Sequence, residues 1–314
     1  MSGVGTPVHW GVFFGLLAVV LAFDLGVLNR GARVVTARRA LGSTLFFVSL
    51  AAGFAVWLAF EAGSQPTLEF VTGYLIEYAL SVDNLFVFLV IFSYFAVPKQ
   101  HQHRVLFWGI VGALVLRGVF ILAGTALIER FHWMLYLFGL FLVVTGGKLL
   151  FAAEEEMDLE QNVALKLCRR FLPVTSQYHG ERFVVRLDGK TWATPLLLVL
   201  LVVDIVDVIF AVDSIPAVFG VTRDPFLVFT SNMFAILGLR SLYFLLAHLM
   251  GRFHYLKYGL GVVLAFVGAK MLVADVLEIP IVVALGAIVL ALGVAVAASW
   301  LFPPRAAKTD DDEP

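Results

Sequence analysis

Cysteine and charged residues are both scarce in this chain of 314 residues. The single cysteine, Cys168, excludes an internal disulfide framework and any metal site built from several thiolates. Only 14% of the residues are charged and 61% are hydrophobic, whereas soluble domains carry about 25% charged residues. A soluble core cannot enclose so many apolar side chains, but a lipid bilayer can. The net charge of −1 also offers no basic surface for nucleic acid.

Long apolar runs make up most of the sequence. Runs of about 20 apolar residues are typical of transmembrane helices. We predict nine of them, over residues 8–28, 42–60, 70–95, 105–126, 133–151, 193–219, 226–249, 258–274 and 280–302. The one long polar connection, residues 152–192, is predicted to be a loop, and residues 303–314 a disordered acidic tail. The chain is therefore expected to be all-α, a polytopic helical bundle forming a single transmembrane domain over residues 1–314.

The basic residues predict how this bundle is oriented. When the connections between spans are assigned to alternating sides, 16 basic residues fall on the side of the first connection and 2 on the other. The 16 are Arg30, Arg33, Arg38, Arg39, Lys99, Arg104, the six basic residues of 152–192, Arg252, Lys257, Arg305 and Lys308, and the 2 are Arg130 and Arg223. Lysine and arginine accumulate in cytoplasmic loops. We therefore expect the N-terminus outside, the C-terminus in the cytoplasm, and 152–192 to be a cytoplasmic loop.

Two parts of the chain repeat one another. Residues 77–84, EYALSVDN, and 207–214, DVIFAVDS, both read acid, five residues, acid and a small polar side chain. Further landmarks recur in the same order: Arg117 and Arg240, then Arg130-Phe131-His132 and Arg252-Phe253-His254, then Gly146-Gly147-Lys148 and Gly268-Ala269-Lys270. We predict a first repeat over 70–151 and a second over 193–274, each with three spans. An odd number of crossings inverts the second copy, as in secondary transporters whose substrate site lies at the midplane between the copies, although channels and some membrane enzymes also use inverted repeats.

Ionisable side chains within the predicted spans are the main functional signal. The acids are Asp24, Glu77, Asp83, Asp204, Asp207 and Asp213, and the bases are Arg117, Lys148, Arg240 and Lys270. A charge at membrane depth costs about 2.5–3.5 kcal/mol, so such residues generally mark function. Six acids against four bases leave a formal charge of −2, which one divalent cation would neutralise.

Helix geometry separates the two acids of each repeat. Glu77 and Asp83 lie about 120° apart around a regular helix, and so do Asp207 and Asp213. For all four to reach one ligand, we expect the helices to be distorted near the second acid. Pro216 supports such a distortion in the second copy, because a proline leaves the carbonyl group four residues earlier without its helical donor.

The candidate ligands supply oxygen atoms only. They are the carboxylates of Glu77, Asp83, Asp204, Asp207 and Asp213 and the small polar side chains Asn84 and Ser214. Oxygen ligands suit hard divalent cations, which leaves manganese, magnesium and calcium. No cysteine or histidine lies beside the acid motifs, which argues against copper(I) and weakens the case for zinc.

The other ionisable residues within the spans leave alternatives open. Asp24 is either an isolated structural hydrogen-bonding group or a functional acid. Lys148 and Lys270 lie near span ends, where we expect them to extend to the membrane interface. Arg117 and Arg240 lie deeper and are either structural counter-ions of the acids or gating residues.

The segments that carry the acids resemble the signature segments of the TerC family, nearest its Alx-type members. These segments are EYALSVDNLFVF (77–88), DIVDVIFAVDSIPAVF (204–219) and DPFLVFTSNMFAILGLRSLYFLL (224–246). The likeness extends from the first to the eighth predicted span. It implies a bacterial inner-membrane protein of the lysine-exporter superfamily, associated with manganese efflux and named for tellurite resistance. It also implies functional roles for Glu77, Asp83, Asp204, Asp207 and Asp213, although position 204 is more often glutamate in such relatives.

These observations predict a secondary transporter that exports Mn²⁺, with no resident cofactor and with proton coupling left open. An alternative is a non-transporting scaffold or redox modulator that acts through the 152–192 loop. An amino-acid exporter fits less well, because acids greatly outnumber groups that bind carboxylates. An enzyme is not expected, since no Ser/His or Cys/His pair shares a membrane depth and no zinc-protease helix motif is present. The oligomeric state is not predicted.

Overall fold

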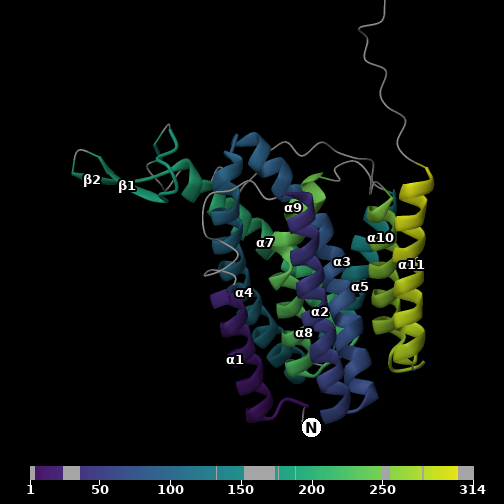
Figure 1. Cartoon of the computed structure of the whole chain (residues 1–314). Coiled ribbons are helices and arrows are strands. Elements are labelled where there is room, and N and C mark those ends of the chain that lie inside the picture. Colours follow the sequence, from purple (N-terminus) through teal and green to yellow (C-terminus); the bar gives the residue numbers. More distant parts are fainter. Residues whose placement is uncertain are drawn as a thin grey trace, which may run out of the picture.

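The computed structural model is a bundle of long helices with a β-hairpin at one end (Figure 1). It describes residues 4–23, 36–131, 133–151, 174–175, 177–187, 189–248, 255–277 and 279–302. The helices are α1 (Pro7–Phe23), α2 (Ala37–Glu61), α3 (Ser64–Tyr94), α4 (Lys99–Arg130), α5 (Met134–Phe151), α7 (Pro195–Phe219), α8 (Pro225–Leu237), α9 (Leu239–His248), α10 (Leu256–Val273) and α11 (Ile281–Leu301). The strands are β1 (Val184–Leu187) and β2 (Lys190–Ala193).

The helices match the predicted polytopic bundle. Seven described helices are long and apolar enough to cross a membrane, and α8 with α9 makes an eighth candidate that is bent by 40°. Helix α1 is apolar but shorter. The all-α membrane fold is thus confirmed, whereas the count of nine spans stays a prediction. Asp24 and the predicted tail 303–314 lie outside the described residues.

Large apolar side chains cover the outer surface of the bundle. Phe60 is 88% exposed, Phe151 89% and Leu290 67%, and they come from three different helices. Apolar surface of this extent is not stable in water, but it is the normal lining of a protein that faces lipid.

The centre of the bundle is built from α3, α4, α7 and α8. Helix α3 packs against α8, and α4 against α7, so the pairing crosses between the two predicted repeats. Helix α8 is the most enclosed, with almost every residue buried. It begins where Asp224 accepts hydrogen bonds from the backbone N–H groups of Phe226 (2.9 Å) and Leu227 (3.2 Å), with Pro225 in its first turn.

Glycines let α5 and α10 cross in close contact. A Cβ atom on Gly146 would lie 2.6 Å from the carbonyl oxygen of Gly261, and one on Gly139 would lie 3.0 Å from that of Gly268. By the spacing of the sequence landmarks, Gly139 corresponds to Gly261 and Gly146 to Gly268. Such reciprocal contacts are what an inverted repeat would produce, although the repeat itself stays a prediction.

The distortion expected near the second acid of α3 and α7 produces no break in either helix. Both helices run through their acid motifs without a break, including at Pro216. Pro216 lies in the last turn of α7, where losing one backbone hydrogen bond leaves the preceding turns intact. The bend lies instead at Gly238, between α8 and α9.

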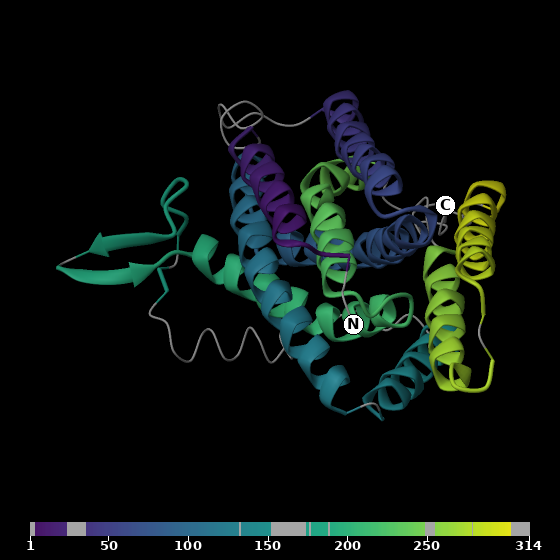
Figure 2. The same ribbon diagram turned by 90° about the horizontal axis from the view of Figure 1, so that it is seen from below.

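The predicted polar loop contains an antiparallel hairpin that sequence analysis missed. Strands β1 and β2 pair from Val184–Ala193 to Leu187–Lys190. The Tyr178 hydroxyl group donates to the Phe95 carbonyl oxygen (2.7 Å) at the end of α3, which ties this segment to the bundle. The hairpin and the end of α11 lie at one end of the bundle and the start of α1 at the other, and α11 and the hairpin lie at opposite edges (Figures 1 and 2). We call these ends the hairpin face and the N-terminal face.

Candidate functional site

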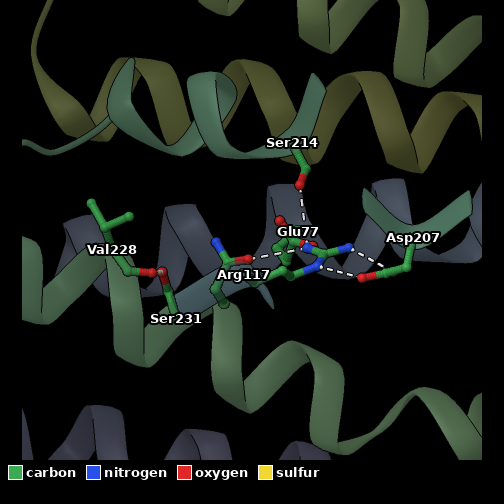
Figure 3. A network of polar contacts seen from close by, with 7 residues as sticks. Glu77, Arg117, Asp207, Ser214, Val228 and Ser231 are labelled. Carbon is green, nitrogen blue, oxygen red and sulfur yellow. Dashed lines mark hydrogen bonds and ion pairs between the residues drawn. The ribbon is translucent and has the colours of Figure 1, made fainter. Parts of the chain in front are cut away.

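The guanidinium group of Arg117 is the centre of a buried polar network (Figure 3). Its Nε and Nη2 atoms donate to the two carboxylate oxygens of Asp207, each at 3.1 Å. Its Nη1 atom donates to Glu77 Oε1, to Ser214 Oγ (3.2 Å) and to Asn232 Oδ1 (3.1 Å). Four helices, α3, α4, α7 and α8, therefore meet at one cation.

Charge balance explains why these groups are found together. Arg117 and Glu77 are fully buried, and Asp207 is 3% exposed. Burying any one of these charges alone would be costly, but a two-pronged arginine–carboxylate pair recovers much of that cost. The network holds two acids against one base, so Arg117 does not neutralise both carboxylates.

Helix periodicity aligns further polar groups with this network. Glu77, Ser81 and Asn84 lie on one face of α3, because residues four and seven positions apart fall on the same side of a helix. Among the described residues, Glu77 Oε2, Ser81 Oγ, Asn84 Nδ2 and Asn232 Nδ2 are buried atoms without a hydrogen-bond partner. Buried polar groups are rarely left unpaired, so these atoms indicate where water or a further ligand could bind.

Asp204 and Asp213 stand apart from the network. The Asp204 carboxylate packs against α4 where Gly112 leaves room, since a Cβ atom there would lie 2.9 Å from Oδ1. This Oδ1 atom is buried without a partner in the part of the chain that the structure describes. Asp213 is half-buried beside the exposed residue Val212, on a different side of α7 from Asp207.

The predicted ligand set is therefore divided. The structure brings together Glu77, Asp207 and Ser214 around Arg117. Asp204 lies one turn from Asp207 on α7 but makes no hydrogen bond to this set, and Asp213 lies on another side of the helix. Asn84 is buried one turn beyond Ser81, and the side chain of Asp83 lies outside the described residues. Within the described residues, no three acidic, histidine or cysteine side chains are arranged to hold a metal ion.

Two features of the site concern residues beyond the predicted set. Arg117 takes the counter-ion role, which was one of the two alternatives for it. Asn232 was missed, and the signal that would have found it is the polar run Thr230-Ser231-Asn232 within a mostly apolar span. Arg240, the repeat counterpart of Arg117, lines a small cavity of about 20 Å³ with Asp207, on the side toward the hairpin face.

Comparison with known proteins assigns the family. The model of the integral membrane protein TerC family matches residues 62–307. The chain is 48% identical over 311 residues to an uncharacterized membrane protein from Myxococcus xanthus, covering 99% of this chain and 98% of that protein. It is 49% identical over 297 residues to Alx of Escherichia coli K12, which bears the name of a proposed membrane-bound redox modulator, covering 92% of each. No solved structure matches. The chain belongs to the TerC family of integral membrane proteins.

Proposed function

We propose that this protein is a secondary transporter that exports Mn²⁺ from the cytoplasm through an intramembrane carboxylate site. The observation that supports it most is the network of Glu77, Arg117 and Asp207 between the two repeats, with unpaired buried oxygen atoms at its edge. Transporters with inverted repeats bind their substrates at this place in the fold.

The donor set favours a hard divalent cation. Glu77, Asp207 and Ser214 offer oxygen atoms, and Ser81 adds another on the same face of α3. Such ligands suit Mn²⁺, Mg²⁺ and Ca²⁺, and the family resemblance favours Mn²⁺ among them. Asp83, Asn84, Asp204 and Asp213 are proposed as ligands of other steps of transport, when the helices have moved.

Arg117 is proposed to occupy the cation site when no ion is bound. Two buried carboxylates attract a cation strongly, and the guanidinium group supplies one from within the chain. A metal ion that takes both carboxylates must displace it, so binding and release become an exchange of one cation for another. Carboxylates can also exchange a metal ion for protons, and Asp204 is proposed as the auxiliary ligand or proton carrier, because its buried oxygen has no partner one turn from Asp207.

The orientation is part of the proposal. The hairpin face carries the loop rich in basic residues, so it is placed in the cytoplasm of a bacterium and the N-terminal face outside the inner membrane.

Mn²⁺ uptake into everted membrane vesicles tests the function. We expect Glu77→Gln and Asp207→Asn to abolish uptake, because each removes a carboxylate that would hold the ion. The matched control is Glu61→Gln, which changes an exposed acid at the end of α2 and leaves uptake at the wild-type rate. Normal uptake by both network variants, with the protein inserted in the membrane, would reject the carboxylate site.

A second candidate function comes from the relatives named Alx. It is a redox modulator or scaffold that does not transport ions and acts through the segment that carries the hairpin. If this candidate is right, the function of the protein depends on the hairpin segment and not on the buried acids.

A further inference from the structure

A polar cavity of about 610 Å³ opens at the N-terminal face. It lies among the start of α3, the end of α7, the end of α10 and the start of α11. Its polar lining consists of Gln65, Glu69, Thr222, Arg223 and Lys270. A cavity with charged walls inside a membrane bundle is filled by water or ions, because charged groups are not stable against lipid.

The charged groups that line this cavity are one acid, Glu69, and two bases, Arg223 and Lys270. Gln65 Nε2 donates to Glu69 Oε1 at 2.9 Å. The Lys270 ammonium group donates to the Gly220 carbonyl oxygen at 3.3 Å and lies close enough to Glu69 to interact with its charge. Glu69 and Lys270 thus influence one another nearer the surface, without the direct ion pair that joins Glu77 and Arg117.

Phe219 is a buried aromatic residue in the lining of the cavity. This residue lines the cavity, yet it is only 3% exposed. Its ring packs where α4 has no side chain, since a Cβ atom on Gly124 would lie 2.8 Å from the ring atom Cε2. Ser214, a member of the Arg117 network, lies five residues earlier on the same helix.

A second close contact involves Gly73, which lies on α3 between Glu69 of the cavity and Glu77 of the network. Glu69, Gly73 and Glu77 follow one another at intervals of four residues, so one face of α3 leads from the cavity to the buried network. A Cβ atom on Gly73 would lie 3.0 Å from Ser231 Oγ, which shows how closely α3 and α8 approach there. Ser231 precedes Asn232, which belongs to the network.

We propose that this cavity is the exit vestibule for the transported cation and that Phe219 and the Gly73–Ser231 contact form its gate. The inference rests on the proposed function and adds the route by which the exported cation leaves the buried network toward the N-terminal face. Glu69 receives the ion after it leaves Glu77, and Lys270 neutralises Glu69 when the vestibule is empty. The cavity that Asp207 lines is far smaller, about 20 Å³, so of these two cavities among the described residues the larger opens at the N-terminal face.

Cysteine accessibility tests the gate without any ion flux. In a Cys168→Ser background, Gln65→Cys places a thiol in the vestibule and Ser231→Cys places one in the gate itself, at the buried contact with Gly73. Intact cells are treated with a charged, membrane-impermeant methanethiosulfonate reagent. We expect rapid modification of Gln65→Cys and slow modification of Ser231→Cys.

Removal of the Phe219 ring should open the passage. We expect Phe219→Ala to raise the rate of modification of Ser231→Cys by about tenfold or more, because the packing contacts of a buried ring are lost. Phe219→Leu, which keeps an apolar side chain, should raise this rate of modification less. It serves as a control for misfolding of Phe219→Ala. The matched control is Phe70→Ala, which removes an equally buried ring on α3 that does not line the cavity. The inference is overturned if Phe219→Ala leaves Ser231→Cys as slow as before, or if Gln65→Cys reacts only in everted vesicles.

Ion flux then separates the two proposals. If Mn²⁺ uptake depends on Glu77 and Asp207 but the accessibility pattern is absent, the gate is rejected and the transport proposal stands. If the pattern is found and no Mn²⁺ is transported, the passage is supported and the identity of its cargo is rejected.

Discussion

At the scale of single residues, the molecule depends on one arginine that binds acids from both predicted repeats. Arg117 donates to Glu77 of the first predicted repeat and to Asp207 of the second. Removing one partner of a buried ion pair costs about 3–5 kcal/mol, because the other charge stays buried without compensation.

Arg117→Gln should therefore lower the thermal stability of the purified protein, and Mn²⁺ should restore much of the loss. The ion binds the folded state alone, and it finds two carboxylates without a competing guanidinium group. Thermal unfolding in detergent, with and without Mn²⁺, measures both effects. Arg130→Gln serves as control, since this arginine is exposed at the end of the same helix. A larger Mn²⁺ effect in the wild type than in Arg117→Gln would contradict displacement of Arg117.

Asp213 lies outside the network but within the proposed transport route. We expect Asp213→Asn to abolish Mn²⁺ uptake while changing the free energy of unfolding by less than about 0.5 kcal/mol, as for residues with few contacts. Asp207→Asn should change both, because it also breaks the bidentate pair with Arg117. Uptake and unfolding are measured on the same preparations. Wild-type uptake by Asp213→Asn would remove this residue from the route.

At the scale of elements, the crossing of α5 and α10 depends on specific glycines. Gly146 and Gly147 are neighbours on α5, yet only Gly146 faces the backbone of α10. A Cβ atom on Gly147 would meet nothing within 4 Å. Substituting each of these two glycines therefore distinguishes the effect of helix packing on stability from the effect of helix propensity.

Gly146→Ala should destabilise the protein by about 1–3 kcal/mol, because a methyl group there must push two backbones apart. Gly147→Ala should be neutral or stabilise it by up to about 1 kcal/mol through helix propensity. Thermal unfolding of the two variants in detergent gives the comparison. Equal stability of the two would show that the close crossing of α5 and α10 is wrong.

The β-hairpin is the element that distinguishes the two candidate functions. We expect Mn²⁺ uptake to survive when residues 184–193 are replaced by a short glycine–serine linker, because the hairpin lies at one end of the bundle, away from Arg117. A modulator or scaffold would lose its function in the same variant. Loss of uptake in a variant that still inserts and unfolds normally would favour the second candidate.

At the scale of the whole molecule, the orientation decides whether the proposed transport is export. The distribution of basic residues predicts that the hairpin face is cytoplasmic. Lys190→Cys in the Cys168→Ser background puts an exposed thiol on β2. An impermeant thiol reagent should modify it in everted vesicles and not in intact cells. Modification in intact cells would show the opposite orientation, with the N-terminal face in the cytoplasm.

The amino-acid sequence by itself determined the class of fold and the importance of the acids. Apolar composition requires a bilayer, and runs of about 20 apolar residues in a bilayer must become helices, because no water is there to satisfy the backbone. The cost of burying charge likewise marks Glu77 and Asp207 as functional candidates, since both fall within predicted spans. These conclusions follow from local sequence and solvent alone.

Only the tertiary structure decided which side chains meet. Helix periodicity places Asp207 and Asp213 on different sides of α7. Because α7 continues without a break at Pro216, the two acids stay on those different sides. The choice of Arg117 as the shared counter-ion depends on which helices pack crosswise, and so does the inclusion of Asn232. These contacts join residues up to 115 positions apart in the chain, and no local pattern specifies them.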